Sequence, residues 1–97
     1  MVELVVRGRI RRGDAADLCE RVRSLLAESP AELVVCDVRA VTDPDLGTVE
    51  VIARLALTAR RLGSRIQLKH ACSGLRELLA LTGLDSVAPC GPDPPPS

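Results

Sequence analysis

The sequence predicts a small α/β domain whose helices pack on a mainly parallel or mixed β-sheet. Strand-like apolar stretches alternate with stretches of helical periodicity along the chain, which is the order of a sheet connected by crossover helices. One stretch, residues 33–38, is apolar at nearly every position, as in a strand buried on both faces. The length of 97 residues suits a single domain.

The first strand is expected over residues 2–10, which are rich in Val and end before a turn around Gly13. Asp14 then provides an N-cap for a helix that Ser29 and Pro30 bring to an end. Apolar residues recur in this helix at helical spacing: Leu18, Val22, Leu25 and Leu26.

The second half of the chain repeats this order. The central strand leads through an acidic turn into a helix over residues 46–62, which ends near Gly63. Residues 65–69 alternate polar and apolar, as in a strand with one solvated face that lies nearer an edge of the sheet. Ser73 is expected to cap the last helix, and Gly83 to end it.

The predicted domain covers residues 1–88. The remaining residues, 89–97, are rich in Pro and are expected to form an extended or disordered tail.

Composition limits the functions of this domain. No Phe, Trp or Tyr is present although 46% of residues are hydrophobic, so the core lacks the rings that usually anchor interfaces. A domain of this size buries roughly two thirds of its unfolded surface, so a partner or a second copy in a homodimer would add stability. The 13 basic residues balance 13 acidic ones, which disfavours a surface for nucleic acid. No segment approaches the length that inserts into a membrane, and no signal peptide is evident. The expected location is therefore the cytoplasm.

The cysteines give no sign of a metal site or a cofactor. Cys19, Cys36, Cys72 and Cys90 are far apart, without a C-x-x-C pair. Cys19 and Cys36 are expected to be small buried hydrophobic residues, and His70 near Cys72 is expected to lie in a solvated loop. The chain also lacks a Gly-rich phosphate loop and a paired set of catalytic carboxylates. We therefore expect a binding protein and not an enzyme.

The acidic turn before the second helix is the first candidate site. A helix N-terminus offers unpaired N–H groups and a positive dipole end, which favour a carboxylate or a phosphate. Asp43 and Asp45 both lie where they could use this end. One of them is expected to cap the helix, and the same turn is a candidate partner-binding surface.

The second helix has a wider apolar arc than one sheet contact requires. Its core stripe comprises Val49, Ile52, Ala53, Ala56 and Ala59. Val51, Leu55 and Leu62 form a flank, which either packs against the last helix or remains exposed to dock a partner. Glu50 and Arg54, at i and i+4, are expected to pair on the exposed side.

Several short motifs in the sequence match those of a known family in order and spacing. Residues 8–10 read Gly-Arg-Ile before a capped helix, and residues 34–38 read Val-Val-Cys-Asp-Val before the acidic turn. Residues 60–63 read Arg-Arg-Leu-Gly, and residues 78–84 form a closing leucine-rich segment with Gly-Leu. From residue 4 to residue 84 the chain thus resembles the STAS family, the sulfate-transporter and anti-sigma-factor-antagonist domains, whose motifs are G-E-[LIV]-D and D-x-S/T-G-[LIV].

In phosphorylated members of that family the loop before the second helix carries a Ser or Thr, which a kinase that is also an anti-sigma factor modifies. No Ser stands there in this chain. One alignment places Asp45 on the family Asp, Leu46 and Gly47 on the hydroxyl positions and Thr48 on the Gly, which leaves Thr48 as a displaced phosphorylation candidate. The other places Asp43 on the family Asp, so that Asp45 is a permanent negative charge at the phosphorylated position.

The resemblance implies a protein-binding regulatory domain, an anti-sigma-factor antagonist of a bacterial partner-switching system that acts in transcription regulation. The partner would be an anti-sigma factor or a serine kinase of the histidine-kinase-like ATPase type. The alternative is a cytosolic STAS subunit of a membrane complex that transports a lipid or an anion. The predicted partner-binding residues are Asp43, Asp45, Gly47, Thr48, Val51 and Leu55.

Overall fold

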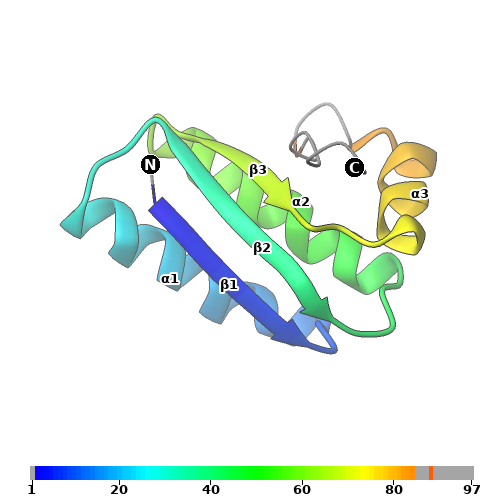
Figure 1. Ribbon diagram of the computed structural model, residues 1–97. Coiled ribbons are helices and arrows are strands. Elements are labelled where there is room, and N and C mark those ends of the chain that lie inside the picture. Colours follow the sequence, from blue (N-terminus) through cyan, green and yellow to red (C-terminus); the bar gives the residue numbers. More distant parts are fainter. Residues whose placement is uncertain (1, 85–87, 89–97) are drawn as a thin grey trace, which may run out of the picture.

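The computed structural model describes residues 2–84 and residue 88 (Figure 1). The order of elements is β1 (Val2–Gly8), the 3₁₀ turn η1 (Arg12–Asp14), α1 (Ala15–Glu28), β2 (Leu33–Val41), α2 (Leu46–Arg61), β3 (Arg65–Lys69) and α3 (Ser73–Thr82). The alternation of strands and helices confirms the predicted α/β class. The predicted tail, residues 89–97, lies outside the described residues and stays a prediction.

The described part of the sheet has three strands in the order β1-β2-β3, and both strand pairs are parallel. β2 is the central strand and β3 lies at an edge, as the sequence predicts. Leu4 of β1 is level with Cys36 of β2, which in turn is level with Leu68 of β3. Because all three strands run the same way, the loops that follow them emerge at one end of the sheet.

The helices cover one face of this sheet. Side chains alternate along β1, with Leu4 and Val6 buried and Glu3, Val5 and Arg7 exposed. Figure 1 shows α1 and α2 on the same side of the sheet, and α2 also packs against α3. The core is therefore an aliphatic layer between one sheet face and the helices, without aromatic rings.

The helix ends differ in part from the sequence prediction. Asp14 does precede α1, but its carboxylate accepts a hydrogen bond from the Arg11 backbone N–H at 2.9 Å and makes none to the α1 backbone. α3 has Cys72 at its N-cap position, so Ser73 is its first helical residue and does not cap it. Gly83 has φ +74 after α3, as expected of a residue that ends a helix in the left-handed region.

The packing of α3 on the core is testable with two leucines of the same helix. Leu75 is fully buried, whereas Leu81 is almost fully exposed. Leu75→Ala should lower the free energy of unfolding by about 2–5 kcal/mol, because it leaves a cavity. Leu81→Ala should change it by no more than about 0.5 kcal/mol. Urea unfolding followed by circular dichroism measures both, and equal losses would contradict the placement of α3.

The cysteines give a second test of burial. Burial raises the pKa of the Cys36 thiol to about 12, so almost none of the reactive thiolate exists at neutral pH. Cys72 is exposed. Alkylation of the folded protein with iodoacetamide, followed by peptide mapping, should label Cys72 rapidly and Cys36 only after unfolding in urea. Equal labelling of the two thiols in the folded protein would show that β2 is not central.

Candidate functional site

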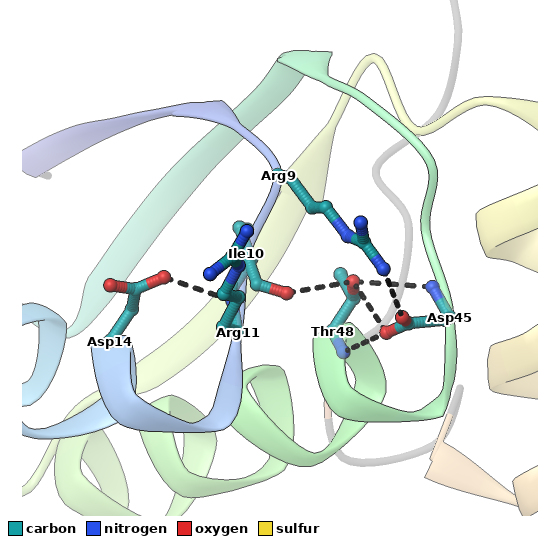
Figure 2. Close-up of polar contacts among 6 residues, drawn as sticks. All are labelled: Arg9, Ile10, Arg11, Asp14, Asp45 and Thr48. Atoms are coloured by element: carbon teal, nitrogen blue, oxygen red, sulfur yellow. Dashed lines mark hydrogen bonds and ion pairs between the residues drawn. The ribbon is translucent and has the colours of Figure 1, made fainter.

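The N-terminus of α2 is held by a reciprocal pair of hydrogen bonds between Asp45 and Thr48 (Figure 2). The Thr48 backbone N–H donates to Asp45 Oδ1 at 3.0 Å, and the Asp45 backbone N–H donates to Thr48 Oγ1 at 3.2 Å. This is a capping box, in which the side chain of each residue accepts a hydrogen bond from the backbone N–H of the other. Two backbone donors that have no partner within the helix are satisfied in this way. Of the two aspartates in the turn, Asp45 is thus the cap.

Thr48 also joins α2 to the segment that follows β1. Its Oγ1 lies 3.5 Å from the carbonyl oxygen of Ile10 and 3.4 Å from Asp45 Oδ1, so its single hydrogen has two acceptors within reach. The residue is 0% exposed. A phosphate on this oxygen would need space and water that the folded site does not offer. Thr48 is therefore a buried structural hydroxyl in this fold.

Asp45 carries a stable negative charge at the surface. The pKa of its carboxyl is lowered chiefly by the hydrogen bond from the Thr48 backbone N–H; the Thr48 hydroxyl, the Gly47 backbone N–H and Arg9 lower it further, and partial desolvation opposes them. Arg9 Nη2 lies 3.9 Å from Asp45 Oδ2. Because the folded-state pKa is below the unfolded one, ionised Asp45 stabilises the fold above the usual carboxyl pKa. That stabilisation is lost as the pH falls through the lowered value.

Asp43 and Gly47 shape the approach to the cap. Asp43 is exposed and has φ 47, a left-handed conformation that Asp tolerates better than most residues. A Cβ on Gly47 would lie 3.1 Å from Asp45 Oδ1, so the absence of a side chain there leaves room for the capping carboxylate. Both predicted site residues thus flank Asp45, and neither replaces it as the cap.

Of the two alternatives for the flank of α2, packing inside the chain holds for two of its three residues, and an exposed docking flank does not. Val51 is 0% and Leu55 is 2% exposed, and both belong to the core. α2 packs against α1 as well as against α3 and β3, so the wide apolar arc is needed inside the chain. Only Leu62 of that flank stays exposed. Val51 and Leu55 are therefore not available as direct contacts for a partner.

The exposed side of α2 is a different row, which we name the α2 stripe: Leu46, Glu50, Arg54, Leu57 and Arg61. Leu46 is 60% and Leu57 is 50% exposed. The sequence prediction missed Leu57 as a surface residue, although it lies three residues after Arg54 and four before Arg61, on the charged side of the helix. An apolar residue among charges at helical spacing is the signal that would have identified it.

Glu50 is the charged centre of the α2 stripe. Its carboxylate lies 3.8 Å from Arg54 Nη2, which confirms the predicted pair, and 2.6 Å from Arg12 Nε. Arg9 and Arg12, from the segment after β1, thus each pair with an acidic residue at the start of α2. The two segments form one surface with paired charges.

His70 lies apart from this surface and makes a different contact. Its Nε2 is 2.7 Å from Arg39 Nη2, and because a guanidinium can only donate, Nε2 is the acceptor in this hydrogen bond. Within residues 2–84 and 88, no hydrogen bond joins His70 to Cys72, and no three His, Cys, Asp or Glu residues gather in a metal-binding arrangement. In the same part of the chain, no helix has the length and apolar character to cross a membrane.

The structural role of Thr48 is testable by removing its hydroxyl. Thr48→Val should lower the free energy of unfolding by about 1–2 kcal/mol, because buried polar partners lose their hydrogen bond, and Thr48→Ser should retain most of the stability. The control is Thr82→Val, whose exposed hydroxyl donates to the Leu78 carbonyl at 2.8 Å and should matter by about 0.5 kcal/mol or less. Equal effects in urea unfolding would contradict the buried network.

Comparison with known families agrees with this architecture. A family model described as Mlab, STAS domain, matches residues 1–89. No curated protein matches the chain. The match spans nearly the whole sequence and contains all three strands and three α-helices of the described fold. The chain therefore belongs to the STAS domain family.

Proposed function

We propose that this chain is an anti-sigma-factor-antagonist-like protein that binds its partner constitutively, without a phosphorylation switch at the start of α2. Membership of the STAS family supports a regulatory or antagonist-like domain. The observation that carries the finer proposal is the state of Thr48, the hydroxyl that follows the acidic turn. It is fully buried and engaged with Asp45 and Ile10, whereas a switch site must be accessible to a kinase.

The negative charge of Asp45 supports the same proposal. It places an ionised carboxylate at the N-terminus of α2, where a phosphate would be favoured for the same electrostatic reason. Its pKa is lowered by hydrogen bonds that exist only in the folded loop. The surface thus holds one fixed charge state at physiological pH, which suits permanent binding better than switching.

The α2 stripe is the surface that we assign to the partner. It places exposed Leu46 and Leu57 on either side of the paired charges of Glu50 and Arg54. Apolar anchors supply affinity at an interface, while charges set orientation. The proposed partner is an anti-sigma factor or a serine kinase of the histidine-kinase-like ATPase type in the bacterial cytoplasm. In this proposal the domain binds without catalysis and needs no cofactor.

A second candidate function rests on the same buried hydroxyl. A STAS subunit of a lipid or anion transport complex would also use a permanent docking surface, and would have no need of a phosphorylated residue. The matched family model is described by the word Mlab, which is a reason to keep this candidate beside the first. The two candidates differ in the partner and not in the surface.

The test of the first candidate is a pull-down from the native cell extract, with and without ATP, followed by intact-mass measurement of the recovered protein. We expect a histidine-kinase-like ATPase in both samples and no added phosphate. ATP-dependent release together with a phosphate on Thr48 would overturn constitutive binding. Recovery of a transport ATPase with a membrane component would establish the second candidate in its place.

The surface is tested separately with two exposed leucines. Leu57→Arg should weaken binding of the recovered partner by about tenfold or more, because it puts a charge among the apolar anchors of the interface. The matched control is Leu81→Arg, an equally apolar and still more exposed position on α3, which should leave binding unchanged. Isothermal titration calorimetry measures both variants. Unchanged affinity of Leu57→Arg would exclude the α2 stripe.

A further inference from the structure

The outer edge of β1 is the strongest feature of the molecule that the α2 stripe does not use. β1 pairs with β2 on one side, and within the described residues no strand pairs with its other side. Figure 1 shows this strand along the margin of the sheet, with α1 beside it on the helix side. An edge strand presents a row of unpaired N–H and C=O groups that can pair with another strand.

Among the described residues nothing pairs with this edge, and α1 does not block it. Two adjoining surface grooves run along it, and both are lined by Val5 of β1 together with Asp17 and Arg21 of α1. Val5 is 41% exposed. The register irregularity near Val5 adds a residue to β2, since Val5 and Arg7 are level with Asp37 and Ala40, so β1 itself keeps a regular alternation. A straight strand can therefore lie against its full length.

The sequence of β1 is complementary to itself in one arrangement. Residues 3–7 read Glu-Leu-Val-Val-Arg, with an acidic end, an apolar middle and a basic end. If two copies pair antiparallel about a two-fold axis at Val5, Glu3 of each copy faces Arg7 of the other, and Val5 faces Val5. Opposite charges directly across an antiparallel pair stabilise it. Arg7 makes no ion pair within the described part of the chain, whereas Glu3 has one carboxylate oxygen 3.6 Å from Lys69 Nζ and can also accept from a second cation.

The residues of α1 that line the groove extend the complementarity. Asp17 and Arg21, four residues apart on α1, line both grooves together with Val5, so both lie on the side of α1 that borders this edge. Neither makes an ion pair within the described residues. A second copy would bring its Arg21 toward Asp17 and its Asp17 toward Arg21, as an isologous two-fold interface requires.

The other edge of the sheet lacks this property. β3 carries exposed Arg65 and Lys69 at its two ends and Gln67 between them. Antiparallel pairing of two copies of β3 about Gln67 would place Arg65 opposite Lys69, and like charges directly across a strand pair are destabilising. Basic residues on an edge strand are a known protection against such pairing. The charge pattern thus favours β1 and disfavours β3.

We propose that β1 is a homodimerisation edge, at which two copies of this chain join antiparallel about Val5 into one continuous sheet. The interface lies on β1 and α1 and not on the α2 stripe, so the proposal does not depend on the proposed function. In the dimer, the strand of the second copy offers Arg7 an acidic partner, Glu3, which Arg7 does not have within the described part of one chain.

The first experiment measures mass in solution by analytical ultracentrifugation over a range of concentrations. We expect a reversible dimer of the wild-type chain. Arg7→Glu should weaken it by about tenfold or more, since two attractive cross-strand pairs become repulsive. Arg60→Glu, an exposed residue in the last turn of α2 and on neither edge strand, is the control that should leave it unchanged. A wild-type chain that is monomeric at every concentration overturns the proposal, as does a dimer that Arg7→Glu leaves intact.

A mixing experiment separates a lost interface from a lost fold. Glu3→Arg alone puts Arg opposite Arg, and Arg7→Glu alone puts Glu opposite Glu, so each variant alone should dimerise at least about tenfold more weakly than the wild-type chain. When the two are mixed, every charge faces its opposite, and a heterodimer should form with an affinity within about threefold of the wild-type dimer. Restored binding shows that the charge changes removed an interface and not the fold, and failure of two variants with native circular dichroism to associate contradicts the proposed pairing of charges.

A cross-link fixes the position of the axis. Two antiparallel residues directly opposite each other have Cα atoms about 4.5–5.5 Å apart, within the range of a disulfide. In a chain with Cys72 and Cys90 replaced by Ser, Val5→Cys should give a reducible covalent dimer under mild oxidation. Arg7→Cys should not, because position 7 of each copy lies opposite Glu3 of the other copy. The two introduced thiols are then several residues apart. A cross-link at Arg7→Cys but not at Val5→Cys would exclude the proposed register.

Discussion

The capping box of Asp45 and Thr48 is the constraint on which the site depends. Thr48 is buried at the start of α2 and reaches both Asp45 and the carbonyl of Ile10. One hydroxyl thus joins the segment after β1, the acidic turn and the helix that forms much of the core. Because a buried polar group must keep its partners, the shape of the turn and the position of α2 are determined together.

This constraint supports the proposal that the loop has no phosphorylation switch. A hydroxyl that satisfies a helix N-terminus from inside the core is not exposed to a kinase in the folded chain. A negative charge at the start of α2 is present as Asp45, whose pKa is lowered by the same hydrogen bonds. Stability and surface charge therefore come from one local arrangement, and the α2 stripe begins directly after it.

Much of the fold was predictable because each element carries its own local signal. Apolar runs and helical spacing identified the strands and α-helices, and Asp45 had the residue type and position of an N-cap. The burial of a side chain by a different helix or strand was not predictable in the same way. Val51 and Leu55 look like a surplus apolar flank on an isolated helix, and they are buried only because α2 lies against both α1 and α3. Leu57 was missed for the converse reason, since it is apolar on a side that no element covers.

The two edge strands of the described sheet differ in charge complementarity, and this difference matters only when two copies pair. Within one copy, the charges of β1 and β3 are alike in being exposed and solvated, and neither set contributes to the core. They differ only under a two-fold operation, which puts Glu3 opposite Arg7 on β1 and Arg65 opposite Lys69 on β3. A two-fold axis perpendicular to the sheet keeps the helices of both copies on the same side. The two α2 stripes then face one way, so a partner with two binding sites would gain from an increased effective concentration at the second site.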